Sequence, residues 1–296
     1  MNLTTSSSWL LDPQDIHLGH EIGRGTFGVV LQGTYFGTNV AIKQIASAAN
    51  ALERAQAAKL LTNEVKTLGQ CRHQNIVRLV GACVTPPMLI MDLASNGTLR
   101  DLLDRSQEQS SSSLTLTPLD RLNLAVGVCN GMTMAHSQNI LHLDLKPANI
   151  LIGPNQVPWI ADFGFAIHMT ASVSRGGSSG GTRGTSQYKA PELFDDEDDD
   201  SDDSDSSGES KGSAAAAPRR ISYQKSADVY SFGMLCFELF TGKVPFGGKS
   251  VEKICSMHMK VLYGGKVIRP KITSDIPSSV VRIVEACWQQ EPASRP

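Results

Sequence analysis

The stretch that decides the fold is HLDLKPANILI, residues 142–152. It places an acid, Asp144, a base, Lys146, and a carboxamide, Asn149, at short fixed spacings before an apolar run. A carboxylate can accept a proton from an attacking hydroxyl, an ammonium group can neutralise a phosphate, and a carboxamide oxygen can bind Mg²⁺. The three side chains are therefore candidates for one catalytic site, and Leu143 stands among them where a charged residue would be easier to explain.

A second acid follows in ADFG, residues 161–164, thirteen residues after Asn149. Two oxygen ligands together with phosphate oxygens suit Mg²⁺, which prefers hard oxygen ligands and retains several waters. Any one of these residues taken alone is more simply explained by a structural role. Their joint occurrence in this order favours chemistry, and we predict Asn149 and Asp162 as metal ligands.

A glycine-rich stretch, GRGTFG at residues 23–28, lies near the start of the chain. The residues after it, 29–43, read as strand, turn and strand, so the glycines are expected in a hairpin whose backbone N–H groups can approach phosphates. Alone, this pattern is as well explained by a plain turn. The next strand, however, ends in VAIK, and Lys43 in an apolar strand needs a partner. Glu64, on the apolar face of the following helix, is the predicted partner.

The composition is that of an ordinary globular protein, with 41% hydrophobic and 19% charged residues. Residues 195–209 carry ten acids, and without them 27 bases face 19 acids. A basic folded part fits an anionic ligand, although a mixed solvated surface is the simpler account. No apolar run reaches the ~18 residues of a membrane span, and no signal peptide is apparent. The six cysteines lack close spacing and are expected to be reduced.

The pattern of residues predicts a strand-rich first part and a helix-rich second part. Strands are expected at 18–46, 76–84 and 88–93, a helix at 49–71, and further helices at 98–106 and 118–138. Residues 105–113 read as a polar loop, 170–185 as a mobile Gly/Ser-rich loop, and 195–220 as a disordered acidic insert.

Taken together, these motifs resemble those of a eukaryotic protein kinase domain, from about residue 16 to residue 296. The matching pieces are GRGTFGVV, VAIK, NEVKTLGQCRHQNIV, HLDLKPANIL, DFG, GTSQYKAPE, SADVYSFG and CWQQEPASRP. The resemblance implies an α+β, bilobal fold that binds ATP and Mg²⁺. It implies an N-terminal tail at 1–15, a small lobe at 16–91, a large lobe at 94–296 and a C-terminal end that is incomplete.

The same resemblance assigns roles to individual residues. Asp144, Lys146, Asn149 and Thr185 would be catalytic, with Met91 as the gatekeeper beside the adenine. The nucleotide would be bound by Ile22, Gly23, Arg24, Gly25, Thr26, Phe27, Gly28, Val30, Ala41, Lys43, Glu64, Met91, Asp92, Leu93 and Leu151. His142, Phe163, Leu68 and Leu79 would stack as a hydrophobic spine, Asp228 would anchor the catalytic loop, and Glu192 would pair with Arg295.

Lys146 and Thr185 resemble the pattern of serine/threonine kinases, and CW before RP resembles the tyrosine-kinase-like group. The catalytic loop is most similar to Mos-type kinases, which act on MAP-kinase kinases, and a Raf-like kinase is the other candidate within the group. The expected partners are protein substrates in the cytoplasm, with no nucleic acid and no membrane insertion. A pseudokinase scaffold is the alternative function, and a small-molecule kinase fits GTSQYKAPE less well. Leu143 replaces the usual arginine, which implies a change in regulation.

Overall fold

The computed structural model describes residues 9–25, 28–45, 51–108, 116–169, 185–194, 224–262, 265–274 and 276–296. The chain divides into two compact units, Met1–Ser172 and Val173–Pro296. The expected boundary between a small and a large lobe near residue 92 lies inside the first unit and stays a prediction. The Gly/Ser-rich loop up to residue 184, the acidic insert at 195–220 and residues 109–113 lie outside the described residues.

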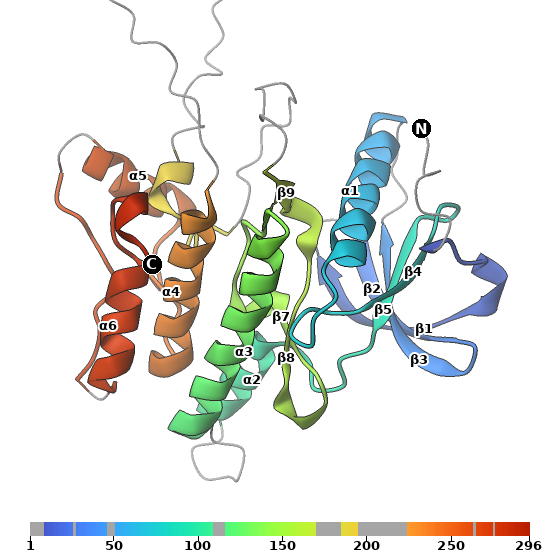
Figure 1. Cartoon of the computed structure of the whole chain (residues 1–296), viewed down its shortest axis with the longest axis horizontal. Coiled ribbons are helices and arrows are strands. Elements are labelled where there is room, and N and C mark those ends of the chain that lie inside the picture. The colour runs from blue at the N-terminus through green and yellow to red at the C-terminus, as the bar shows by residue number, and fades with distance from the viewer. Residues whose placement is uncertain are drawn as a thin grey trace, which may run out of the picture. The chain divides into compact units, whose positions relative to one another are not determined.

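Strand-forming residues build a five-stranded antiparallel sheet in the first unit (Figure 1). Its strands are β1 (Ile16–Gly25), β2 (Gly28–Tyr35), β3 (Thr38–Ile45), β4 (Leu79–Cys83) and β5 (Met88–Asp92), in the order β1-β2-β3-β5-β4. Val40 and Ile42 of β3 are buried in one apolar cluster with Ile90 of β5. Since side chains alternate along a strand, Ala41 and Lys43 point to the other face. The sheet thus confirms the predicted strands and directs Lys43 away from the apolar cluster.

Helix α1 (Ala51–Gln70) is the one main helix between strands β3 and β4. Leu61, Val65 and Leu68 recur at helical spacing and are all buried, as their spacing predicts. Glu64 lies on the same side and is 3% exposed. Burial of the apolar stripe therefore fixes the rotation of α1 and, with it, the direction of the Glu64 carboxylate.

Residues 9–15 of the expected N-terminal tail are described, and residues 10 and 11 lie beside β4. Leu11 N donates to the carbonyl of Ala82 at 3.0 Å, and Leu10 forms a bridge with the same residue. The indole of Trp9 lies against Arg72, whose guanidinium carbon is 5.2 Å from the ring centroid. The folded part of the chain therefore begins before residue 16.

The rest of the first unit is helical, with two small antiparallel pairs of strands. Helices α2 (Leu99–Glu108) and α3 (Pro118–Ser137) are followed by β6 (Ile140–Leu141), β7 (Ile150–Ile152), β8 (Pro158–Ile160) and β9 (Ile167–His168). β6 pairs with β9 and β7 with β8. The expectation of a polar loop from residue 105 is wrong for 105–108. These residues form the last turn of α2, where Arg105 donates to the carbonyl of Asn96 at 3.1 Å.

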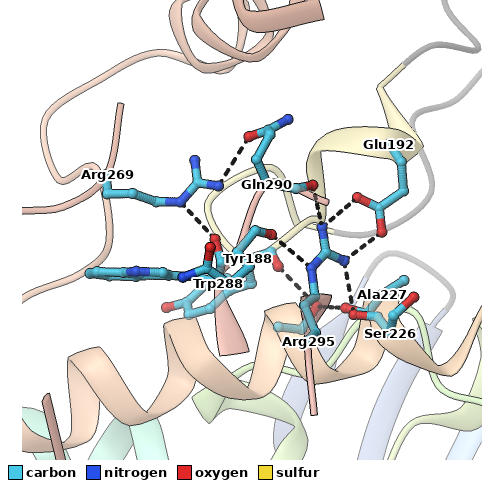
Figure 2. Close-up of polar contacts among 10 residues, drawn as sticks. Tyr188, Glu192, Ser226, Ala227, Arg269, Trp288, Gln290 and Arg295 are labelled. Atoms are coloured by element: carbon cyan, nitrogen blue, oxygen red, sulfur yellow. Dashed lines mark hydrogen bonds and ion pairs between the residues drawn. The ribbon is translucent and has the colours of Figure 1, made fainter. Parts of the chain in front are cut away.

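The second unit contains α4 (Lys225–Thr241), α5 (Val251–Leu262) and α6 (Ser278–Cys287). Helix α4 ends at Gly242, whose φ of 71° suits glycine and whose N–H donates to Glu238 O. Glu192 and Arg295 form the predicted ion pair, with Nη1 and Nη2 at 2.6 and 2.8 Å from the two carboxylate oxygens (Figure 2). This pair joins the short helical turn at Pro191–Leu193 to the end of the chain.

His258 of α5 is buried among aromatic rings of the second unit and is 2% exposed. Its ring is stacked on Phe194, with centroids 4.8 Å apart, and meets Phe246 edge-on at 5.7 Å. Its Nε2 has no hydrogen-bond partner among the described residues. Burial, and secondarily the charge of Arg269, lower the pKa of His258 to about 4.

We expect the stability of the protein to fall as the pH drops through the window between the unfolded pKa of His258, ~6.5, and its folded pKa. In this window the unfolded chain binds the proton and the folded chain does not, so acid favours unfolding. The loss should reach about 2 kcal/mol at pH 5. His258→Phe keeps the stacking and removes the titration. Denaturant unfolding at pH 7 and pH 5 should therefore give a smaller difference for this variant, and an equal difference would contradict the assignment.

Candidate active site

The centre of the site is the ammonium group of Lys43, which bonds to two carboxylates. Its Nζ lies 3.1 and 2.9 Å from the two oxygens of Glu64 and 2.7 Å from Oδ1 of Asp162. Lys43 lies on strand β3, Glu64 lies on helix α1, and Asp162 immediately precedes the turn at Phe163–Phe165. The predicted Lys43–Glu64 pair is therefore present, and Asp162 is a further partner that the sequence did not indicate.

These charges shift one another's pKa values. Burial alone would lower the pKa of Lys43, but the carboxylates of Glu64 and Asp162 outweigh it and raise that pKa above its usual range. Burial raises the pKa of Glu64, and Lys43 offsets part of this effect. For Asp162, burial is outweighed by Lys43, His142 and Lys146, so its pKa is lowered. Lys43 is thus kept charged and Asp162 ionised.

The loop that carries Asp144 leaves strand β6 at His142 and is held by that side chain. His142 Nε2 lies 3.0 Å from the carbonyl oxygen of Ala161, and its ring meets Phe163 edge-on at 4.8 Å. Both rings are fully buried, as are Leu68 and Leu79. The loop and the segment carrying Asp162 are therefore joined directly, through a pair of residues predicted to belong to a hydrophobic spine.

Asp144 is almost buried, with 5% exposure, and two neighbours orient it. Asn149 Nδ2 donates to Asp144 Oδ2 at 2.9 Å and to its carbonyl at 2.7 Å. Lys146 Nζ lies 2.8 Å from the same carboxylate oxygen. The three residues singled out in the sequence therefore form one cluster, in which a fixed carboxylate can accept a proton from a hydroxyl.

The oxygen atoms of Asn149 and Asp162 fit the coordination chemistry of Mg²⁺. Because Asn149 uses its amide nitrogen toward Asp144, its carboxamide oxygen is the atom left for a cation. Asp162 uses Oδ1 toward Lys43, which leaves Oδ2. Within the described ranges there is no group of three or more His, Cys, Asp or Glu residues suited to a metal. A cation bound here would thus need phosphate oxygens and water as further ligands.

Comparison with known protein families gives one match over nearly the whole chain. The family model for protein tyrosine and serine/threonine kinases matches residues 16–296. The chain belongs to this family. The α+β fold class predicted for a bilobal protein kinase is confirmed, and so is the predicted enzyme class of protein serine/threonine kinase.

Individual kinases similar to this chain include Mos proteins. The transforming protein mos of Moloney murine sarcoma virus (strain ts110), a serine/threonine-protein kinase, is 31% identical over 299 residues, covering 97% of this chain and 76% of that protein. The proto-oncogene serine/threonine-protein kinase mos of Mus musculus is 30% identical, covering 97% and 78%. Serine/threonine-protein kinase STY17 of Arabidopsis thaliana is 28% identical, covering 98% and 44%. The predicted resemblance to tyrosine-kinase-like, Mos-type kinases is confirmed.

The kinase domain spans only part of several longer relatives. It covers 44% of STY17 and 15% of the mimivirus protein R831, to which it is 30% identical.

In the described part of the chain, no helix has the length and apolar character that a membrane span requires.

Several residues predicted to contact the nucleotide lie on strands near Lys43. Val30 of β2 pairs with Lys43 of β3, and Ala41 pairs with Met91 of β5. Leu151 lies on β7. The carboxylate of Asp92 bonds to Arg78, and its backbone N–H donates to the carbonyl of the same residue. The β1–β2 hairpin carries Ile22, Gly23, Arg24, Gly25 and Gly28. Leu93 follows β5, and Thr26 and Phe27 lie outside the described residues. Contact of all these residues with ATP stays a prediction.

Two other predicted residues, Thr185 and Asp228, lie in the second unit, so their roles beside the catalytic loop stay predictions.

Leu143 is 5% exposed and has a φ of 63°, which an L-residue adopts at a cost of about 1–2 kcal/mol. Its side chain offers no hydrogen-bond donor for a phosphate.

Reasoning from the sequence missed a second set of contacts between α1 and the segment after Asp162. Asn63 and Thr67 of α1 bond to Ala166 and His168, about a hundred residues away. An Asn and a Thr in a helix are common solvent-facing residues, so only their position on either side of Glu64 could have drawn attention to them.

Proposed function

We propose that this kinase domain transfers the γ-phosphate of ATP to serine and threonine hydroxyls of protein substrates. The observation that carries the proposal is the cluster of Asp144, Lys146 and Asn149 beside the ion-paired Lys43. The charge of Lys146 acts on Asp162, so the loop and the ion-paired group form one electrostatic unit. The similar proteins are named as serine/threonine-protein kinases, which supports the choice of acceptor.

Each residue has a distinct part in the proposed transfer. Lys43, held by Glu64, binds the phosphates of the nucleotide in place of its contact with Asp162. Asp144 orients the substrate hydroxyl and accepts its proton, and Lys146 neutralises charge on the transferred group. Asn149 and Asp162 would hold Mg²⁺, which neutralises the phosphate oxygens when bound. Catalysis then comes chiefly from positioning and electrostatic stabilisation.

We expect Lys43→Met to abolish transfer, because the variant loses the cation and leaves Glu64 buried without a partner. The measurement is the transfer of labelled γ-phosphate from ATP to a mixed protein substrate, followed by phosphoamino-acid analysis. Lys59→Met is the matched control, since Lys59 is an exposed lysine on the same helix as Glu64. Near-normal transfer by Lys43→Met would contradict the assignment of the nucleotide site.

A scaffold that binds ATP and partners without transfer is the second candidate function. The scaffold would be favoured if the unchanged protein binds ATP and never transfers phosphate, while Lys43→Met does not bind ATP.

We also propose a cytoplasmic site of action. On the similarity to Mos, we propose MAP-kinase kinases as candidate substrates. A Raf-like role is the alternative within the same group. Incubation with purified MAP-kinase kinases tests this finer proposal separately from transfer itself.

We expect substantial activity from unphosphorylated protein. In kinases with arginine at the position of Leu143, a phosphate on the activation segment bonds to that arginine and orders the segment. Leu143 is buried and apolar, so this contact cannot form. The rate before and after complete phosphatase treatment is the measurement. A loss of tenfold or more, about 1.4 kcal/mol of barrier, would show that another basic residue receives a phosphate.

A further inference from the structure

Two side chains of helix α1 bond to the segment that follows Asp162. Asn63 Nδ2 donates to the carbonyl oxygen of Ala166 at 3.0 Å. The hydroxyl of Thr67 lies 3.3 Å from Nε2 of His168. The two helix residues are four positions apart and therefore lie on one face of α1, with Glu64 next to the first of them.

One partner of each bond is buried, and the other is partly exposed. Thr67 is fully buried and Ala166 is 6% exposed, so a broken bond would leave a buried polar group unpaired. Burial, and then the charge of Lys66, lower the pKa of His168. The neutral imidazole can accept the proton of the Thr67 hydroxyl.

The same segment is fixed on its other side to the catalytic loop. In the β6–β9 pair, Ile140 lies opposite His168 and Leu141 opposite Ile167. Met169 N donates to the carbonyl of Asn139 at 2.9 Å. Because β6 runs directly into the loop that carries Asp144, the segment at 166–169 lies between α1 and the catalytic base.

We propose that Asn63 and Thr67 are positioning residues that hold Glu64 on Lys43 by fastening α1 to residues 166–168. The fastening consists of uncharged hydrogen bonds and needs no phosphate, which is consistent with a buried leucine at position 143. The inference rests on the proposed transfer activity. Neither residue touches the reacting atoms, so both act through Glu64.

The test compares variants of matched shape. Thr67→Val keeps the volume and removes the hydroxyl, whereas Thr67→Ser keeps the hydroxyl and should retain the rate. Thr67→Val and Asn63→Ala are each expected to lower kcat by about tenfold, or ~1.4 kcal/mol of barrier. Thr133→Val and Asn130→Ala are the controls, since both are exposed on α3 and should leave kcat within twofold.

A double-mutant cycle separates positioning from general destabilisation. In a Glu64→Gln background, measured by single-turnover kinetics, Thr67→Val should cost less than threefold, because the group it positions is already lost. An undiminished tenfold cost in that background, or no cost in the wild-type background, would overturn the proposal.

A second measurement does not depend on transfer. Hydrogen exchange at the amides of residues 163–169 should quicken at least fivefold in Thr67→Val and not in Thr67→Ser. If exchange responds in this way while the unchanged protein transfers no phosphate, the fastening stands and the proposed function fails. Unchanged exchange in Thr67→Val would overturn the fastening whatever the activity.

Discussion

Asp144→Asn is expected to lower turnover by about 10²–10⁴-fold while ATP still binds. The carboxamide has the shape of the carboxylate but cannot take a proton from a hydroxyl. Asn149 already donates to Asp144 Oδ2, and it can donate equally to the carbonyl oxygen of an asparagine side chain. The architecture of the loop should therefore survive, and the loss should fall on kcat rather than on the KM for ATP.

The measurement is steady-state kinetics together with direct ATP titration. Asp104→Asn is the matched control, because Asp104 is an exposed carboxylate paired with Arg100 on the same helix. Its kinetics should match those of the unchanged protein. Turnover within tenfold of normal for Asp144→Asn would mean that another group orients and deprotonates the substrate hydroxyl. A loss of ATP affinity as large as the loss of kcat would mean that Asp144 is part of the nucleotide site.

The parts of the site that could be read from the sequence are those set by local geometry. Asp144, Lys146 and Asn149 lie within six residues, so the chain itself brings their side chains together. Lys43 and Glu64 could be paired because strand alternation and the apolar face of α1 fix the direction of each side chain. In the second case the elements are formed by strong, regular patterns, which is why the sheet and α1 were also predicted.

The parts that could not be predicted depend on contacts between distant segments with no periodic signal. Asn63 bonds to a backbone carbonyl 103 residues away, and any residue could supply that acceptor. Trp9 lies against Arg72 and Leu11 bonds to Ala82 of β4, so the chain is folded where the resemblance implied a tail. The bond from Lys43 to Asp162 depends on how the turn at Phe163–Phe165 approaches β3. Side-chain packing at long range decides each of these features, and sequence patterns do not encode it directly.

The side chain of Arg295 is fully buried and bonds to several residues of the second unit (Figure 2). Nε donates to Gln289 O at 2.8 Å, Nη1 to Glu192 at 2.6 Å and to Ser226 O at 2.9 Å, and Nη2 to Glu192 at 2.8 Å and to Gln290 O at 3.1 Å. All five N–H donors of the guanidinium are thus used. The group also lies over the ring of Tyr230, 5.1 Å from its centroid.

Arg295→Ala is therefore expected to destabilise the protein by about 3–5 kcal/mol, because it leaves a carboxylate and three carbonyls without their donor. Arg295→Lys should recover little of this loss, since an ammonium group has three donors and lacks the planar fork that Glu192 accepts. Arg282→Ala, which removes an exposed arginine of α6, should stay within about 0.5 kcal/mol of the unchanged protein. Denaturant unfolding followed by fluorescence provides the measurement. If Arg295→Ala cost no more than Arg282→Ala, the five bonds would not contribute to stability. If the Arg295→Lys variant were as stable as the unchanged protein, the positive charge alone would account for the stabilisation and the planar shape of the guanidinium would not be needed.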